Sequence, residues 1–192
     1  GVQTQGKHYL ASEWNIKKFT NNRFNNIKLN ENAPPKVSEK TYAIIKNNFV
    51  NSQDIDQNNL LVFENNLSFE TTDFKDFKFK KIYLVSNGNE NRSIKLSEKV
   101  SKFKSLLIKD QEQRIKNLSI ECGIIDISEV KSIGENIIGL YPTVGENLDY
   151  VNSNNLKINF LYRKLDQYSW QYCNKGFFNF KNYIPKIITM FT

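Results

Sequence analysis

The stretch Phe74–Val85, FKDFKFKKIYLV, gives the clearest secondary-structure signal in the chain. Phe77 and Phe79 alternate with Lys78 and Lys80, and the run then becomes wholly apolar. Successive side chains of a strand point to opposite faces, so this alternation predicts a strand with one face in a core and the other in water.

Other parts of the chain show similar patterns. Apolar and polar residues alternate over Leu156–Arg163, and Tyr168, Trp170 and Tyr172 alternate with polar residues further on. The second pattern predicts a hairpin that returns through Phe177–Phe180. Asn65-Asn66 suits a tight turn, because Asn tolerates positive φ. Further strands are expected at Tyr42–Val50, Leu60–Glu64, Leu67–Glu70, Leu118–Ser128, Ile137–Tyr141 and Ile187–Phe191.

A helix is predicted over Ser97–Lys109. Val100, Phe103, Leu106 and Leu107 form one apolar stripe at helical spacing, and Ser97 can act as the N-cap. The strands follow one another without intervening helices, which argues against an alternating parallel α/β fold. We therefore predict a mostly β or α+β fold, namely an antiparallel β-sandwich or barrel with one or two covering helices.

The length of 192 residues and the 39% hydrophobic content fit a single domain over residues 1–192 with a core of its own. Residues 1–8 are polar and are expected to fray, and residues 31–36 contain paired prolines that suit a linker or a crossing loop. No apolar run reaches the length of a transmembrane helix. The oligomeric state is not predictable from these features.

The net charge of +7 is not evidence for a nucleic-acid partner. Asn and Lys are both abundant, as an AT-rich genome would produce, and Arg occurs only at positions 23, 92, 114 and 163. Nucleic-acid binders usually rely on Arg for bidentate contacts with phosphate and guanine. We therefore do not expect nucleic acid as a partner.

Cofactor and metal motifs do not stand out in the sequence. The single histidine, His8, lies in the polar N-terminal segment, and the glycines follow no phosphate-binding pattern. Asp54, Asp56 and Asn58 alternate like the start of a calcium loop, but the expected Gly and the final Glu of such a loop are missing. The sequence predicts neither a cofactor nor a metal site.

An enzymatic alternative is a hydrolase that uses paired carboxylates in a cleft of the β scaffold. The candidates are Glu64, Glu70, Asp73, Asp76 and Glu121. A second alternative is a carrier of small apolar ligands, which requires a closed barrel with an unfilled interior.

The two cysteines, Cys122 and Cys173, belong to no metal-binding or redox motif. They could form one disulfide in an exported protein, or they could be two separate buried thiols, and the sequence does not decide between these hypotheses. The start at Gly1, the Asn-rich loops and the disulfide hypothesis lead us to expect a secreted, periplasmic or envelope-associated protein.

Aromatic residues crowd the last thirty positions of the chain. If Tyr168, Trp170 and Tyr172 share one strand face, that face lies either in the core or on a recognition surface. The sequence therefore predicts a non-enzymatic binding or assembly module that recognises a protein, peptide or glycan through these three aromatic side chains.

Overall fold

The computed structural model describes residues 12–24, 26, 55–134, 137–173 and 176–191. Contacts divide the chain into two compact units, Gly1–Ile44 and Ile45–Thr192. The first unit contains helix α1, Glu13–Phe19, whose N-terminus is capped by Ser12: the Asn15 amide donates to Ser12 Oγ at 3.2 Å. The segments 1–8, 31–36 and 42–50, for which fraying, a linker and a strand were predicted, lie outside the described residues.

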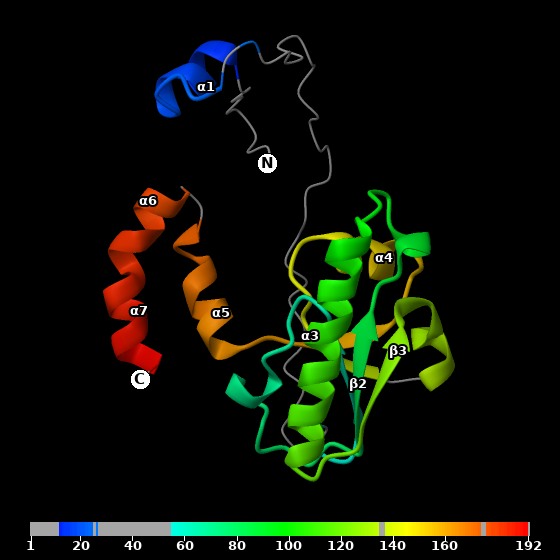
Figure 1. Ribbon diagram of the computed structural model, residues 1–192. Helices are drawn as coiled ribbons and strands as arrows, with labels where there is room; N and C mark the ends of the chain where they lie inside the picture. The colour runs from blue at the N-terminus through cyan, green and yellow to red at the C-terminus, as the bar shows by residue number, and fades with distance from the viewer. Residues whose placement is uncertain (1–11, 25, 27–54, 135–136, 174–175, 192) are drawn as a thin grey trace. The chain divides into compact units, whose positions relative to one another are not determined.

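The second unit is built on one five-stranded parallel sheet with strand order β3-β2-β1-β4-β5 (Figure 1). Its strands are β1, Asn59–Phe63; β2, Lys81–Ser86; β3, Cys122–Asp126; β4, Ile137–Leu140; and β5, Ile158–Leu161. The central strand β1 pairs with β2 in register Leu61↔Tyr83 and with β4 in register Leu61↔Gly139.

Burial on both faces explains why these strands are parallel and central. In β1 every residue from Leu60 to Phe63 is buried, and all four residues of β4 are buried. Strands covered on both faces consist of continuous apolar runs rather than alternating ones, which is typical of parallel sheets in α/β proteins.

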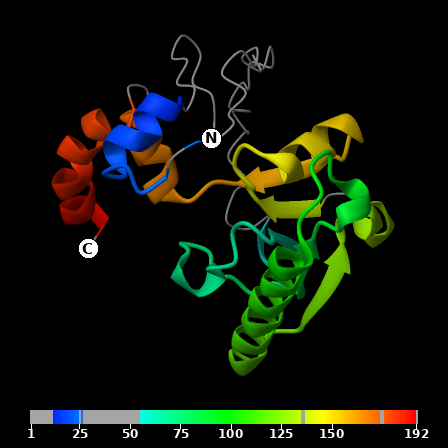
Figure 2. The same ribbon diagram turned by 45° about the horizontal axis from the view of Figure 1, so that its top comes forward.

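Two apolar layers cover the sheet. Helix α3, Glu98–Asn117, and the segment that contains the short helix η1, Phe69–Thr71, pack on one face. The helix η3, Ile127–Ile133, and helix α4, Glu146–Ser153, pack on the other. Figure 2 shows α3 lying along its face of the sheet. The chain is therefore a three-layer α/β fold in this unit.

The C-terminal part of the second unit is helical. It consists of α5, Lys164–Trp170; α6, Phe177–Phe180; η5, Lys181–Tyr183; and α7, Ile184–Phe191. Helices α5 and α7 lie side by side and contact each other (Figure 1). The described helices of the chain include none that is long and apolar enough to cross a membrane.

The predicted antiparallel sandwich or barrel is wrong, because all four strand pairings are parallel and the sheet is open. The barrel needed for an apolar-ligand carrier is therefore wrong as well. The strand expected over Phe74–Val85 is confined to Lys81–Ser86. The preceding phenylalanines instead form a ring cluster in a loop, where Phe79 contacts Phe69 edge to face at 5.9 Å between ring centroids.

Three other predicted strands are helices. Tyr168–Tyr172 falls on the end of α5 and the two residues after it, Phe177–Phe180 is α6, and Ile187–Phe191 belongs to α7. The Asn65-Asn66 turn exists, but neither residue has positive φ and no hairpin follows, since β1 is succeeded by η1. The helix at Ser97 is confirmed: Ser97 caps it, and it extends to Asn117.

Candidate functional site

The carboxyl ends of the five strands meet at one edge of the sheet, and a ligand site in this fold is expected there. Along the chain, the strands step from β1 to β2 and β3 in one direction and then return to β4 and β5 on the other side of β1. Ligands of open α/β sheets bind outside the carboxyl ends of the strands, near the point where the order reverses. In this chain the reversal lies between β1 and β4.

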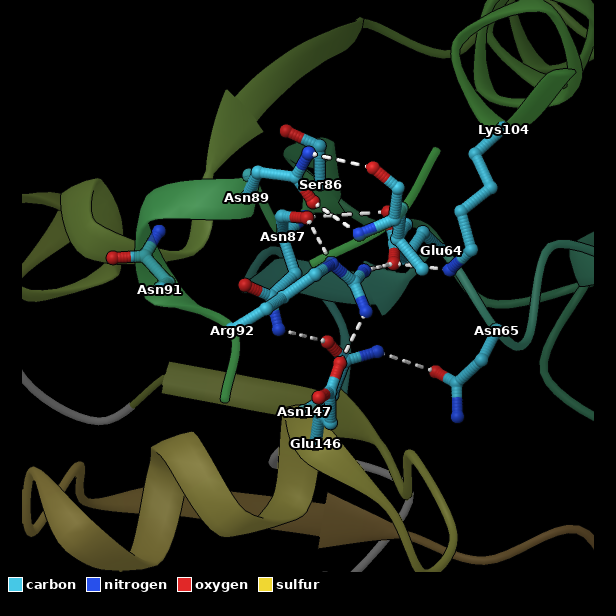
Figure 3. A network of polar contacts seen from close by, with 12 residues as sticks. Glu64, Asn65, Ser86, Asn87, Asn89, Asn91, Arg92, Lys104, Glu146 and Asn147 are labelled. Atoms are coloured by element: carbon cyan, nitrogen blue, oxygen red, sulfur yellow. Dashed lines mark hydrogen bonds and ion pairs between the residues drawn. The ribbon is translucent and has the colours of Figure 1, made fainter. Parts of the chain in front are cut away.

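A buried charge cluster occupies this edge (Figure 3). Arg92 is held between Glu64, which follows β1, and Glu146, the first residue of α4; one guanidinium nitrogen donates to each carboxylate. The side chains of Arg92 and Glu64 are each only 6% exposed. Lys104 of α3 also donates to Glu64. Each of these charges therefore has an opposite partner, as burial in a low-dielectric environment requires.

Backbone groups complete this cluster. Arg92 Nε donates to the Asn87 carbonyl at 2.9 Å, and the Asn87 amide donates to Glu64 Oε2 at 3.2 Å. The loop after β2 is thereby tied both to the end of β1 and to the helix η2, Asn89–Asn91, beside which Arg92 lies. This arrangement fixes the loop without the help of a ligand.

A relay of asparagine amides spans the reversal point of the sheet (Figure 3). Asn87 Nδ2 donates to Asn147 Oδ1 at 3.0 Å, and Asn147 Nδ2 donates to Asn65 Oδ1 at 2.9 Å. Asn65 Nδ2 in turn donates to the Pro142 carbonyl after β4. These contacts join the loops that follow β1, β2 and β4. Asn87 Oδ1 is buried and accepts no hydrogen bond from the described residues.

Next to the charge cluster, between α3 and the ends of β1 and β2, lies a cavity of about 430 Å³. That volume is within the range of small-molecule sites. The polar part of its lining includes Ser101, Lys104 and Ser105 from the first turns of α3 and the loop residues Asn87 and Asn89. Its apolar part consists of Leu96, Ile108 and Ile124. Lys109 contributes a second ammonium group to the cavity lining. The lining contains one carboxylate, that of Glu64.

The loop after β3 is fixed by a carboxylate. Asp126 accepts hydrogen bonds from the Gly88 amide at 3.2 Å, from Asn91 Nδ2 at 3.0 Å and from the Ser128 amide at 2.9 Å. Burial acts to raise the pKa of Asp126, but the hydrogen bonds from Ser128, Gly88 and Asn91 outweigh it and lower the pKa below its ordinary value. The ionised form of Asp126 therefore also holds in place the loop after β2, which contributes Asn87, Gly88 and Asn89 to the cavity lining.

A second cavity, of about 570 Å³, opens near the amino ends of β4 and β5. Its lining includes Lys131, Lys157 and the start of each strand at Ile137 and Ile158. It lacks a buried polar cluster like the one at the carboxyl edge, so we place the functional site at the carboxyl edge.

The carboxylates proposed for a hydrolase do not converge. Only Glu64 belongs to the cluster at the carboxyl edge. Glu70 accepts from Gln111 at 2.7 Å, Asp73 accepts from the Lys164 amide at 2.7 Å, and Glu121 pairs with Lys81 at 2.8 Å. Asp76 is not part of this cluster. The two carboxylates that do approach one another, Glu64 and Glu146, both face Arg92.

The three aromatic residues predicted to share a strand face lie in α5 and just after its end, and they contact different neighbours. Trp170 packs edge to face against Tyr141 and Tyr162, at 5.8 and 5.6 Å between centroids. Tyr168 and Tyr172 contact each other, and Tyr172 stacks on Tyr183 at 4.3 Å. Burial raises the pKa of Tyr162, beside Trp170, to about 12. Whether these residues bind a partner stays a prediction.

Both cysteine thiols are free in the structure. Cys122 is buried on β3, and Cys173 is exposed, with its Sγ 3.4 Å from the Ser169 carbonyl. Burial, reinforced by the charge of Glu112, raises the pKa of Cys122 to about 11. Of the residues that alternate like the start of a calcium loop, Asp56 accepts from the Lys78 amide at 3.0 Å and Asp54 lies outside the described residues. Within the described ranges, no three His, Cys, Asp or Glu side chains are grouped to hold a metal ion.

Most residues of the site were not predicted from the sequence, although a pattern in the sequence indicates them. Three apolar or loop segments end in short polar groups rich in asparagine: Glu64-Asn65-Asn66, Ser86-Asn87-Gly88-Asn89 and Glu146-Asn147. Polar residues that directly follow buried strands gather at one edge only if the strands are parallel. In the predicted antiparallel sheet these residues would be divided between the two edges, so their proximity was not expected.

Comparisons with known proteins identify no relative. No family model matches the sequence, and neither the curated proteins nor the solved structures include a significant match. The function is therefore inferred from the chemistry of the site itself.

Proposed function

We propose that the second unit is a ligand-binding domain for a small anionic molecule of the nucleotide class, bound in the cavity at the carboxyl edge. The observation that carries this proposal is the cavity itself, which combines two ammonium groups and two serine hydroxyls with an apolar wall. Lysine and hydroxyl donors suit a phosphate group, and aliphatic side chains suit the flat face of a base.

The position of the cavity supports the same proposal. It lies at the ends of β1 and β2, beside the reversal of strand order, where doubly wound sheets bind their ligands. Ser101 and Lys104 lie in the first two turns of α3, where the positive end of the helix dipole adds to the attraction for an anion. The rigid cluster around Arg92 holds the adjoining loop in place, which lowers the entropy lost on binding.

Binding is tested by isothermal titration of the full chain with adenosine and uridine mono- and diphosphates, and with inorganic phosphate in a separate arm. We expect a dissociation constant for a nucleotide in the range of about 1 mM to 1 μM, typical of small polar ligands. Ser101→Leu fills the cavity and Lys109→Met removes an ammonium group, so each should weaken binding about tenfold or more, equivalent to about 1.4 kcal/mol.

Lys116→Met is the matched control. Lys116 lies on the same helix and pairs with Glu112 at 2.7 Å, and it does not line the cavity. This variant should bind as the unchanged chain does. If no nucleotide binds at millimolar concentration, or if Ser101→Leu leaves the affinity unchanged, the proposed site is wrong. Binding of inorganic phosphate alone would restrict the ligand to the anionic group.

A further inference from the structure

The first two residues of α6 expose two adjacent aromatic rings. Phe177 and Phe178 are 65% and 77% exposed, and they contact each other at 5.8 Å between centroids. On α7, Met190 is 61% exposed. Large apolar side chains that stay in water at this density mark an interaction surface.

The charge of this segment is strongly one-sided. From Lys164 to Thr192 the sequence contains four lysines and a single acidic residue, Asp166. Asp166 is already engaged by Arg163 Nε at 2.7 Å. Lys181 lies over the Phe178 ring, 5.4 Å from its centroid. Among the described residues, the Lys181 ammonium therefore lies beside the exposed aromatic rings, and the one acidic side chain of the segment is paired with Arg163.

Together, these features fit an anionic lipid surface better than a protein groove. Lysine is depleted at the core of protein–protein interfaces, where a long charged chain would have to be desolvated. At a membrane surface the same side chain keeps its ammonium in the headgroup layer while aromatic rings enter the acyl boundary. Each lysine near an anionic leaflet adds electrostatic attraction that salt screens.

We propose that the C-terminal helices attach the protein peripherally to anionic membranes, with Phe177 and Phe178 inserted and Lys181 facing the headgroups. Phe177 and Phe178 begin the four-residue helix α6, so the inserted area is small and the attachment is shallow and reversible. It is independent of the ligand cavity, which is lined by α3 and by the strand ends.

Vesicle sedimentation tests this attachment on the full chain. The probes are phosphatidylcholine vesicles with and without about 30% phosphatidylserine, in about 0.15 M salt. We expect the anionic vesicles to bind at least about tenfold more protein, and we expect about 0.5 M salt to weaken the binding markedly. The double variant Phe177→Ser/Phe178→Ser should lower partitioning about tenfold or more, because two exposed rings no longer leave water.

Phe103→Ser is the matched control, because Phe103 is 60% exposed on α3 and is not part of the proposed surface. It should bind vesicles within about twofold of the unchanged chain, since removing an exposed ring elsewhere leaves the inserted area the same. Thermal unfolding checks that both variants fold, which their exposure favours. Ser101→Leu should bind vesicles normally, so failure of the ligand proposal and failure of this one can be told apart.

Three outcomes would overturn the proposal. Equal binding to neutral and anionic vesicles would remove the role of the lysines. An equal loss with Phe103→Ser would indicate general adhesiveness. Sedimentation-velocity evidence that the unchanged chain self-associates, but that the double Phe variant does not, in the absence of vesicle binding, would assign the surface to a second copy of the chain.

Discussion

Arg92 is the most informative residue to remove, because within the described part of the chain it is the only cation that contacts both Glu64 and Glu146. Arg92→Met keeps most of the side-chain length and removes the charge. The variant leaves Glu64, whose side chain is 6% exposed, with Lys104 and one backbone amide as its partners. It also removes the donor to the Asn87 carbonyl.

The expected loss of stability follows from this burial. Breaking a buried ion pair by removing one partner costs about 3–5 kcal/mol, because the other charge stays out of water. At about 2–4 °C per kcal/mol for a domain of this size, the midpoint of thermal unfolding should fall by about 6–20 °C. Urea unfolding followed by circular dichroism measures the free energy, and a thermal scan measures the midpoint.

Arg114→Met is the control for this measurement. Arg114 pairs with Glu70 and Asp110, but its side chain is 58% exposed and solvent screens these pairs, so its loss should cost far less than the loss of Arg92. Adding Glu64→Gln to Arg92→Met should recover part of the loss, because the unpaired buried carboxylate is removed. If Arg92→Met costs no more than Arg114→Met, the cluster at the carboxyl edge is not buried as described.

Four further predictions concern the core and the titrating groups. At pH 8 without denaturant, a thiol reagent should modify Cys173 and spare Cys122, and mass spectrometry should count one adduct; two adducts in the native state, or none in the denatured state, would contradict this. Burial raises the pKa of Cys122 to about 11, so the folded chain keeps a proton that the unfolded chain loses. The free energy of unfolding should therefore fall as the pH rises above about 9, and this fall should be smaller in Cys122→Ala. Ile115→Ala should lower the free energy of unfolding in urea by about 2–5 kcal/mol, because Ile115 is fully buried. Phe103→Ala should lower it by less than about 0.5 kcal/mol, because Phe103 is exposed, and the opposite order would contradict the assignment of the buried face of α3. The pKa of Asp126 is lowered by its hydrogen bonds, so its stabilisation is present at neutral pH and is lost as the pH falls below about 4; Asp126→Asn should flatten that acid limb of the stability curve, and an unchanged acid limb would exclude this role.

Local patterns in the sequence identify the apolar strands but not their pairing. The runs at Leu60, Ile82 and Ile137 are strands, and Ser97 does begin a helix. Parallel and antiparallel sheets differ in which residues oppose one another, and that depends on the path of the chain between strands. The connection from β1 to β2 contains only the short helix η1, so the usual signature of a βαβ unit is absent from it.

Period-two patterns also arise on helices. Tyr168 in α5 and Tyr172, two residues after the end of α5, contact each other, whereas Trp170 lies between them and packs against Tyr141. The alternation of these aromatic residues therefore reflects two separate sets of aromatic contacts. An eleven-residue window is needed to separate the two periods, and the helix is shorter than that.

Helix α3 was predicted correctly, but its buried face was not. Val100 and Phe103 of the apolar stripe are 43% and 60% exposed, whereas Ile108, Gln111 and Ile115 are buried. The buried face is partly polar because Gln111 donates to Glu70 at 2.7 Å, and such a partner is visible only in three dimensions. The asparagines of the site were missed for the same reason.

A ¹⁵N-resolved NMR titration of the full chain with uridine diphosphate tests the central claim most directly. The amides of Gly88, Ser101 and Ser105, which line the cavity, should shift together and saturate with one dissociation constant. Shifts confined to the C-terminal helices, or spectra that stay unchanged at millimolar nucleotide, would show that the carboxyl edge of this sheet does not bind such a ligand.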